Sequence, residues 1–385
     1  MTQVGFYTGC LQQLVLQPTP FCNLACTYCY LPHRDEKASM SPEVLDAAFC
    51  FVRDARLSSD NLELRWHAGE PLAVPLQFYE DAFIRAKRIL GSQTVLHHSI
   101  QTNAVLLNAD WANFFKLNNV RIGISIDGPS EIHDARRLTR KGGGTFHKVM
   151  QGIKWLQACN LSFDVIAVIT PQTLRYPSAF MDFFADLEGM NQLGLNVEET
   201  EGSHISEAFS KDNFESNFRD FLENLMRWSR KTGITVREFQ SMRSRILNGA
   251  GSAIRNTQNE PFTILTISSN GDMVTFSPEL QGMIHPIFGN FSIGNVLLNT
   301  PNSVSFSPSW FQMAADISYG KALCRANCSY FSVCGGGAPI NKLYENHSFA
   351  TMQTQHCLLT VKSIADVVLS AMEREAGIEF VPEHL

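Results

Sequence analysis

Three cysteines near the start of the sequence have a spacing that suits metal binding. Cys22, Cys26 and Cys29 form the pattern C-x3-C-x2-C in the segment CNLACTYC. Three thiolates on one loop can hold three irons of a [4Fe–4S] cube and leave the fourth iron open to another ligand. A closed zinc site normally takes a fourth protein ligand. The spacing therefore favours an iron–sulfur cluster over zinc and over three unrelated buried thiols.

A second group of cysteines lies near the C-terminus. Cys324, Cys328 and Cys334 form C-x3-C-x5-C, three glycines follow, and Cys357 comes later in the chain. Four thiolates can saturate a [4Fe–4S] cube and close the site. A structural zinc ion suits the same ligands, and these residues alone leave the two alternatives open. The other cysteines are expected to be inert buried thiols, namely Cys10, Cys50 and Cys159.

The composition limits the partners and the compartment. Of the 385 residues 44% are hydrophobic and 18% charged, and the formal net charge is -6. This predicts an ample core and no basic patch for a nucleic-acid backbone, so a peptide or a small molecule is the expected partner. We find no export signal and no apolar run that could span a bilayer, and expect a cytoplasmic protein without a membrane partner. Cytosolic thiols stay reduced, which favours metal ligation by the cysteines.

The elements that must position these residues alternate between strands and helices. Short runs of β-branched residues predict strands at 12–18, 62–67, 95–102, 120–127, 162–170 and 192–198. The first helix should begin at the N-cap Ser41, with Pro42 at its first position. Six such units predict an α/β fold, a partial (β/α)6 barrel whose functional groups gather at the carboxyl ends of the strands.

We expect three regions along the chain: the partial barrel at 1–210, a helical connection at 211–254 and a cysteine-rich domain at 255–385. The connection should contain a helix with Phe214, Phe218, Phe221 and Leu225 on one face. The last region should begin with a hairpin that turns at Asn270-Gly271 and end with an amphipathic helix near 358–375.

From about residue 12 to 375 these motifs resemble the radical S-adenosylmethionine (SAM) superfamily. The resemblance implies that Cys22, Cys26 and Cys29 hold a [4Fe–4S] cluster whose open iron binds the amino and carboxylate groups of SAM. Tyr28 and Tyr30 stand where the superfamily has an aromatic residue beside the cluster and adenine. The segment HAGEP resembles the Gly-Gly-Glu-Pro element, in which the backbone and the glutamate, here Gly69 and Glu70, receive the SAM ammonium.

The same resemblance assigns residues at the ends of later strands to SAM. Polar contacts to its ribose and methionine parts are implied for Thr102, Asn103, Ser125 and Asp127. Asp127 could instead cap the turn at Gly128-Pro129. Arg137 could form a local ion pair or bind the SAM carboxylate. Ile169 is implied to pack against adenine.

The C-terminal region resembles the SPASM extension of sulfatase and peptide maturases, here reduced or twitch-like. A complete extension has seven cysteines and two auxiliary clusters. This sequence has Phe276-Ser277-Pro278 and Ala338 where two of those cysteines are expected. The resemblance therefore implies one auxiliary [4Fe–4S] cluster, the outer one, on Cys324, Cys328, Cys334 and Cys357.

Three segments, TFSPELQG, NVEETEG and CGGGAPINKLYENHSF, resemble the cyclophane-forming maturases of the GrrM/OscB type. That group implies a ribosomally made precursor peptide as substrate and an electron donor such as a flavodoxin or ferredoxin. A 5′-deoxyadenosyl radical would start a C–C cross-link between an aromatic side chain and the β-carbon of a nearby residue. Loss of a proton from the ring needs a base, for which Glu279, Glu198 and Glu199 are candidates, although each could be a structural carboxylate instead.

Two other functions are considered. One is a sulfatase-type maturase that oxidises serine or cysteine to formylglycine, although the missing cysteines and the absence of an aspartate near Glu279 count against it. The other is a non-catalytic iron–sulfur protein that binds a peptide or senses redox state. The segments HAGEP, QTN and SIDGP disfavour this second alternative, because a scaffold needs no SAM pocket.

Overall fold

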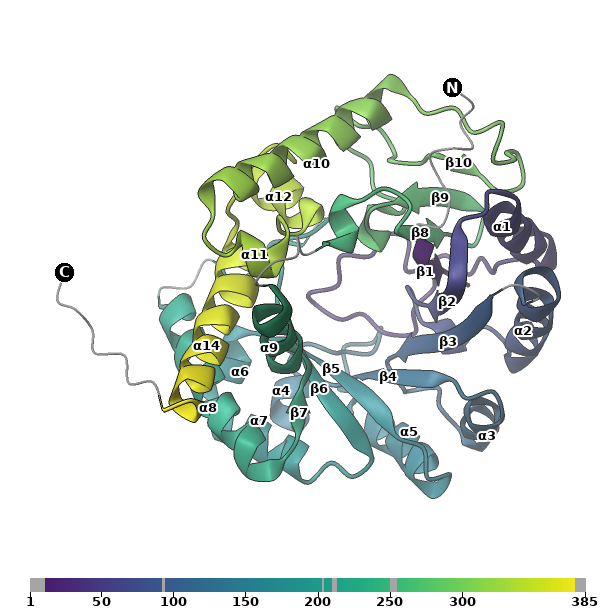
Figure 1. Cartoon of the computed structure of the whole chain (residues 1–385). Coiled ribbons are helices and arrows are strands. Elements are labelled where there is room, and N and C mark those ends of the chain that lie inside the picture. The colour runs from purple at the N-terminus through teal and green to yellow at the C-terminus, as the bar shows by residue number, and fades with distance from the viewer. Residues whose placement is uncertain (1–10, 92–93, 203, 210–212, 250–254, 378–385) are drawn as a thin grey trace.

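The protein is described by a computed structural model that covers residues 11–91, 94–202, 204–209, 213–249 and 255–377, so Cys10 lies outside it. Its centre is one curved sheet with helices on its outer side (Figure 1). Neighbouring strands are parallel from the first to the sixth. All six predicted strands are present: β1 (Leu11–Leu16), β2 (Ser58–Trp66), β3 (Val95–Thr102), β4 (Arg121–Ser125), β5 (Phe163–Ile169) and β6 (Met190–Val197).

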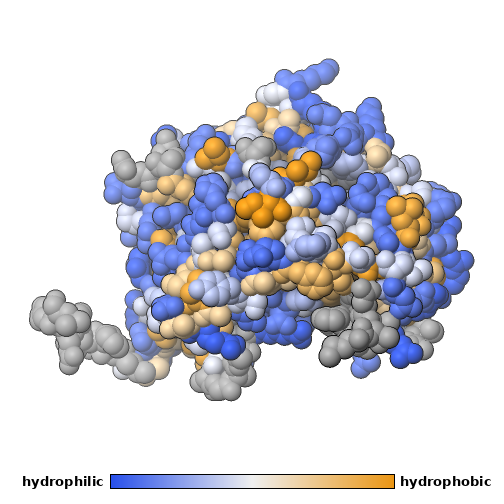
Figure 2. Space-filling view, turned by 90° about the horizontal axis from the view of Figure 1, so that it is seen from above, coloured by the Kyte–Doolittle hydropathy of each residue, from blue (hydrophilic) through white to orange (hydrophobic). Residues whose placement is uncertain are grey.

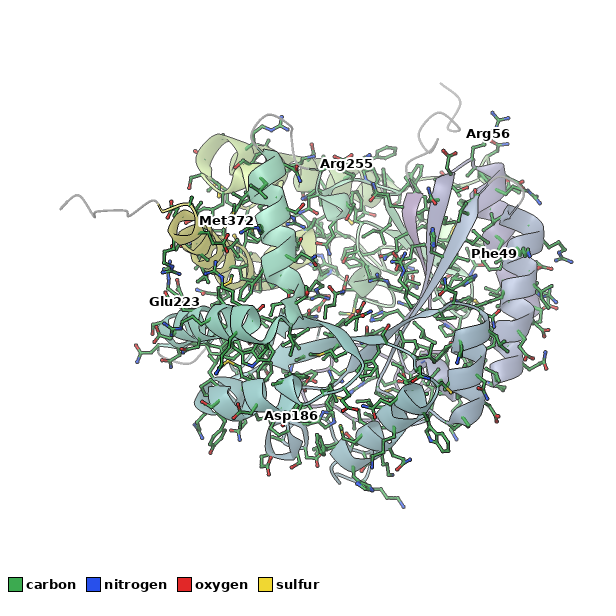
Figure 3. The ribbon with its side chains drawn as sticks, turned by 60° about the horizontal axis from the view of Figure 1, so that its bottom comes forward. Phe49, Arg56, Asp186, Glu223, Arg255 and Met372 are labelled. Carbon is green, nitrogen blue, oxygen red and sulfur yellow. The ribbon has the colours of Figure 1, made fainter. Side chains whose placement is uncertain are left out.

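Amphipathic helices cover the outer face of this sheet. They are α1 (Pro42–Asp54), α2 (Leu76–Leu90), α3 (Ala109–Leu117), α5 (Phe146–Ala158) and α7 (Pro177–Ala185), with short α4 (Ser130–His133) and α6 (Pro171–Arg175) between them. As predicted, α1 begins at Ser41, whose side chain accepts a hydrogen bond from the Val44 N–H. Its Phe49 is fully buried on the sheet side of the helix, while Arg56 lies beyond its end in solvent (Figure 3).

Two long helices follow the sixth strand. The predicted apolar face of α8 (Phe214–Thr232) is confirmed, because Phe214, Phe218, Phe221 and Leu225 are all buried. The short strand β7 (Thr235–Val236) joins it to α9 (Arg237–Gly249). Both helices pack against α14 (Ile364–Glu375), and Figure 3 shows Glu223 of α8 and Met372 of α14 on this side of the molecule.

The predicted hairpin belongs to the same sheet as the barrel strands. It consists of β8 (Ile264–Ile267) and β9 (Asp272–Thr275), and Gly271 in its turn has a φ of 92°. β8 pairs in parallel with β1, and β10 (Gly294–Asn295) pairs with β9. The order is therefore β10-β9-β8-β1-β2-β3-β4-β5-β6-β7. The sheet continues across the expected boundary at residue 254.

The rest of the chain is mostly helical and closes one side of the sheet (Figure 1). It comprises α10 (Pro308–Asn327), α11 (Phe331–Cys334), α12 (Pro339–Asn346), α13 (Gln355–Cys357), a π-helical stretch (Leu358–Ser363) and α14. The predicted final helix therefore exists, but its first part is π-helical. Within the described ranges, no helix has the length and apolar character needed to cross a bilayer. Figure 2 shows one face of the surface, where hydrophobic side chains lie scattered among polar ones.

Candidate active site

A cavity of about 430 Å³ lies at the carboxyl ends of the parallel strands. This is the place that the barrel-like arrangement predicts for functional groups. Residues after β1, β2, β3, β4 and β6 line it together with residues from the C-terminal region. Of the residues predicted to act there, the structure brings these to its wall: Cys22, Cys26, Tyr28, Cys29, Tyr30, Gly69, Glu70, Thr102, Asn103, Ser125, Arg137, Glu198, Glu199 and Glu279.

The cysteine loop after β1 is fixed by backbone hydrogen bonds. The Ala25 N–H donates to Leu138 O at 2.8 Å and the Thr27 N–H to Arg136 O at 3.0 Å. Arg140 Nε donates to the carbonyl oxygen of Cys22 at 2.8 Å. The loop therefore lies against the segment that follows α4, and its three thiols face the cavity.

The surroundings of Cys22 and Cys26 disfavour free thiolates. Burial, followed by the charge of Glu70, raises the pKa of Cys22 to about 12. Burial also raises the pKa of Cys26 to about 11, against the opposing effect of Arg137. Neutral thiols are therefore favoured in the metal-free protein. A bound iron centre would reverse that preference, because coordination deprotonates a thiol and releases its proton. The donor set fits a cluster.

The segment after β2 approaches the chain before Cys22 very closely. Gly69 has a φ of 56°, and a Cβ there would lie 2.5 Å from Thr19 O. Ala68, which replaces the first glycine of the superfamily element, also has a positive φ of 72°, a conformation that costs free energy for a residue with a side chain. Only glycine fits the second position.

Glu70 is buried and holds the ends of two strands together. Its Oε1 accepts hydrogen bonds from the Leu72 N–H at 2.9 Å and from Thr102 Oγ1 at 2.6 Å, and its Oε2 accepts one from the Asn103 N–H at 2.8 Å. Burial raises its pKa although these hydrogen bonds lower it. Three of the roughly four lone-pair positions of a carboxylate are thus used within the protein, and one remains for a ligand in the cavity.

Asn103 and Ser125 extend the polar wall beside Glu70. Asn103 Nδ2 donates to Asn23 Oδ1 at 2.8 Å and lies 3.8 Å from Cys22 Sγ. Gln101 Nε2 donates to Ser125 Oγ at 2.9 Å. The ends of β3 and β4 therefore contact both the cysteine loop and the open space.

Asp127 does not reach the cavity, in contrast to its predicted contact with a ligand. It is buried, and its Oδ1 accepts a hydrogen bond from the Val168 N–H at 3.0 Å. Its Oδ2 accepts one from the Tyr28 hydroxyl at 2.6 Å and pairs with Arg137 Nε at 3.0 Å. Asp127 therefore joins β4 to β5 and to the cysteine loop. Neither the predicted contact with SAM nor the alternative role as a turn cap describes this position.

Ile169 also lies away from the cavity. Side chains alternate between the two faces of a strand, and along β5 the cavity side is occupied by Ile166 and Val168. Ile169 is fully buried on the opposite, core side. An apolar contact from β5 to a ligand would therefore come from Val168, its neighbour in sequence.

Four carboxylates line the cavity, three of them near Cys29 and Tyr30 of the cysteine loop, and one of the four was not predicted. Glu201, the unpredicted one, is buried, and its Oε1 has no hydrogen-bond partner. Burial, followed by the charges of Glu279 and Glu199, raises its pKa well above the ordinary value. Burial likewise raises the pKa of Glu279, whose carboxylate accepts a hydrogen bond from Ser277.

The other two carboxylates are paired with histidines. Glu198 Oε1 lies 3.0 Å from His204 Nε2. Glu199 Oε1 lies 3.2 Å from His356 Nε2, and its Oε2 accepts a hydrogen bond from Asn341 Nδ2 at 2.7 Å. Burial opposes ionisation of Glu199, but His356 outweighs it and lowers the pKa. His356 and Asn341 also line the cavity and were not predicted.

The C-terminal cysteines form a separate group outside this cavity. Cys324 lies in the last turn of α10, Cys328 caps that helix, Cys334 ends α11 and Cys357 ends α13. Burial, followed by the charge of Cys334, raises the pKa of Cys357 to about 11, and Cys328 contributes in the same direction. Lys342 Nζ lies 3.5 Å from Cys324 Sγ.

The glycines after Cys334 are required by the path of the chain. Gly335, Gly336 and Gly337 have φ values of 71°, 113° and 74°, a run that side chains would strain. The loop returns so that the Gly337 N–H donates to Cys334 Sγ at 3.0 Å. Asn256 and Asn259 each donate to Gly337 O at 2.9 Å and hold this loop in place.

Comparisons with known proteins show what the chain is similar to. The sequence profile of the Radical SAM superfamily matches residues 16–184. An uncharacterized protein of Synechocystis sp. is 36% identical over 371 residues, covering 95% of this chain and 93% of its own. The serine-type anaerobic sulfatase-maturating enzyme of Bacteroides thetaiotaomicron is 27% identical over 340 residues, or 83% of this chain and 80% of its own.

The fold is also found among solved structures. The native protein anSMEcpe with bound AdoMet and Cp18Cys peptide superposes with a TM-score of 0.75 at 20% identity, covering 95% of this chain and 99% of its own. At this identity the likeness shows the fold.

Proposed function

The chain belongs to the radical SAM superfamily and is a radical SAM enzyme, and from this premise we propose that it matures a ribosomally made precursor peptide. In the proposed reaction an aromatic ring carbon is joined to the β-carbon of a nearby residue, as in maturases of the GrrM/OscB type. One observation carries the proposal. The three segments that resemble this group, far apart in the sequence, all contribute side chains to the same cavity.

The contributions of the three segments are specific. NVEETEG supplies Glu198, Glu199 and Glu201, TFSPELQG supplies Glu279, and CGGGAPINKLYENHSF supplies Ala338, Ile340 and Asn341. Glu199, Glu201 and Glu279 lie near Tyr30 and Cys29 of the cysteine loop. A peptide residue bound in this part of the cavity would therefore be next to both groups, as a radical reaction followed by proton removal requires.

We propose that Cys22, Cys26 and Cys29 hold a [4Fe–4S] cluster and that Gly69, Glu70, Thr102, Asn103, Ser125 and Arg137 bind SAM, with Tyr28 and Tyr30 beside them. Bound there, the reduced cluster would supply the electron that cleaves SAM to methionine and a hydrogen-abstracting 5′-deoxyadenosyl radical. Glu70 lines the cavity, and its remaining acceptor position would receive a hydrogen bond from an ammonium group. Arg137, held by Asp127, would present its other nitrogens to a carboxylate.

To become aromatic again the ring radical would lose one electron and one proton. The electron would pass to an oxidised iron–sulfur cluster. The proton needs a base, and the four carboxylates differ in their fitness for this role. Glu199 is engaged by His356 and Asn341, and Glu198 by His204. Glu279 and Glu201 combine burial with a raised pKa, which suits a base working near neutral pH. We therefore propose that an Oε atom of Glu279 or Glu201 takes the ring proton.

A sulfatase-type maturase remains the second candidate, because the relative from Bacteroides thetaiotaomicron carries that name. The residues in place of the two missing cysteines favour the cross-linking proposal. Phe276 is 1% exposed and packs in a hydrophobic core with Leu280 and Phe349. Ala338 faces the cavity as a small apolar side chain. We propose that a single auxiliary cluster is held by Cys324, Cys328, Cys334 and Cys357.

The test is an anaerobic incubation of reconstituted protein with SAM, a flavodoxin or ferredoxin system and a short, aromatic-rich peptide encoded beside the gene. The product should lose two hydrogen atoms. Tandem mass spectrometry should give no fragments between the two joined residues. Glu279→Gln and Glu201→Gln should lower the yield of cross-linked peptide while SAM cleavage continues.

The control separates the two candidate functions. Oxidation of serine to formylglycine also removes two hydrogen atoms, but its aldehyde reacts with a hydrazide probe and its peptide fragments normally. A hydrazide-reactive product would favour the sulfatase-type reaction. SAM cleavage with an unmodified peptide, across several aromatic-rich peptides, would count against the cross-linking proposal.

A further inference from the structure

A fully buried lysine lies among the C-terminal cysteines. Lys342 of α12 is 2% exposed, and its Nζ donates to Cys324 Sγ at 3.5 Å. Two glycines make room for it: a Cβ at Gly320 of α10 would lie 3.3 Å from Nζ, and a Cβ at Gly337 would lie 3.6 Å from Lys342 Cε. The fold therefore accommodates the whole side chain between α10 and the glycine loop.

The charge of this lysine needs a partner inside the protein. A buried ammonium without a counter-charge is strongly disfavoured, because it loses its hydration. Among the described residues, no carboxylate lies within ion-pair distance of Lys342 Nζ. Its Nζ donates a hydrogen bond to Cys324 Sγ, which becomes an anion when the thiol loses its proton. Coordinated thiolates are negative, so an occupied cysteine site would supply the counter-charge through Cys324.

We propose that Lys342 is a fixed counter-charge for the auxiliary cluster and makes that cluster easier to reduce. The proposal rests on the cluster that the proposed function places at Cys324, Cys328, Cys334 and Cys357. Reduction adds one negative charge to a buried site, and a nearby ammonium stabilises the more negative state. A hydrogen bond to a ligating sulfur acts in the same direction.

The experiment measures the reduction potential of the auxiliary cluster in the absence of substrate. The background is the full chain with Cys22, Cys26 and Cys29 changed to Ala, which leaves one cluster of about four irons. Lys342→Met keeps the length and removes the charge. Its matched control is Lys321→Met on α10, because Lys321 Nζ is already paired with Glu260 at 2.9 Å, and Glu260 keeps Arg255 as a partner.

The reduction potential is measured by a redox titration followed by electron paramagnetic resonance. We expect Lys342→Met to shift the potential to a more negative value, and Lys321→Met to leave it unchanged. An iron-loaded Lys342→Met protein with the parent potential would overturn the proposal. So would a parent protein that holds zinc in place of iron.

A second variant covers the possibility that Lys342→Met does not retain iron. Lys342→Gln keeps an N–H donor without the charge, and circular dichroism checks its fold. A loaded Lys342→Gln protein with a smaller negative shift supports the proposal. If neither variant holds iron, Lys342 is needed for assembly of the site and the tuning role is wrong. Failure of peptide cross-linking would leave these measurements unaffected.

Discussion

Arg137 Nε lies 3.0 Å from Asp127 Oδ2, and both side chains are buried. Burial lowers the pKa of the guanidinium. The charges of Asp127, Tyr28 and Cys26 together raise it by a larger amount, so the pKa lies above its ordinary value. The Arg137 guanidinium lies 5.4 Å from the centre of the Tyr28 ring. One ion pair thereby joins β4, the cysteine loop and the wall of the cavity.

Loss of this pair should destabilise the protein strongly. Asp127→Asn leaves the Arg137 charge buried without its counter-charge, and removal of one partner of a buried pair costs about 3–5 kcal/mol. The free energy of unfolding of the metal-free protein in denaturant measures the effect. Asp54→Asn is the control, because the Arg53–Asp54 pair is about half exposed and should contribute at most about 1 kcal/mol. Equal effects of the two changes would contradict the structure.

Glu70→Gln should weaken the binding of SAM while the iron content stays the same. The change removes a charge-assisted contact worth on the order of 1.5–3 kcal/mol, and Glu70 is not a proposed iron ligand. Calorimetric titration with SAM gives the affinity. Glu63→Gln in β2, the strand that precedes Glu70, is the control, because Glu63 pairs with Arg65 outside the cavity. An unchanged SAM affinity for Glu70→Gln would exclude the proposed contact.

His133 should make the metal-free protein sensitive to acid. Its Nδ1 accepts a hydrogen bond from the Asp127 N–H at 3.3 Å, and its Nε2 lies 3.0 Å from Thr145 Oγ1. Thr145 Oγ1 donates to Arg137 O at 2.7 Å, so Nε2 carries the proton of the neutral ring. Burial lowers the pKa of His133 from 6.5 to about 4.

The sign of this effect follows from the lowered pKa. The folded state disfavours protonation, so the stability is present above pH 6.5 and is lost as the pH falls toward 4. The loss from this one group is at most about 3 kcal/mol at 1.36 kcal/mol per pKa unit. His133→Asn should flatten the pH dependence of the free energy of unfolding between pH 7 and 4. Parallel curves for the two proteins would show that the histidine does not contribute.

Gly336→Ala should disrupt the C-terminal cysteine site. Its φ of 113° is unfavourable for alanine, and the added Cβ would lie 3.0 Å from Lys321 Cγ. We expect a loss of about 1–3 kcal/mol in stability and of about half of the iron in the reconstituted protein. Gly142→Ala is the control, because Gly142 also has a positive φ, 80°, but nothing lies within 4 Å of the added Cβ. That variant should keep all of its iron.

Local patterns in the sequence predicted much of the fold. The six parallel strands, the start of α1 at Ser41 and the hairpin turn at Asn270-Gly271 depend on neighbouring residues alone, and all three are confirmed. The parallel pairing of β8 with β1 joins distant parts of the chain. No local pattern contains that information, so the hairpin was expected in a separate domain.

The candidate site likewise contains residues that local motifs predicted and residues whose positions depend on distant parts of the chain. Residues in motifs at strand ends, such as Glu70 and Asn103, were identified from their sequence context and line the cavity. Glu201 was missed because it lies in the loop after β6, farther from the strand than Glu198 and Glu199, and its position near Glu279 and Cys29 depends on contacts between distant parts of the chain. Asp127 points away from the cavity because it pairs with Arg137, and Ile169 because it packs in the core behind β5. Both contacts depend on how separate elements pack together, which local sequence does not show.

The parallel pairing of β8 with β1 also determines when the protein can mature during its synthesis. β1 leaves the ribosome first, but one of its edges has no partner until residues 264–267 have been made. An unpaired strand edge is open to wrong pairing in the meantime. The cavity wall formed by Glu279 and Asn341 is made later still. The cysteine loop is therefore made long before β8, Glu279 and Asn341, and a cluster inserted there early would lie beside an unfinished sheet and an incomplete cavity wall.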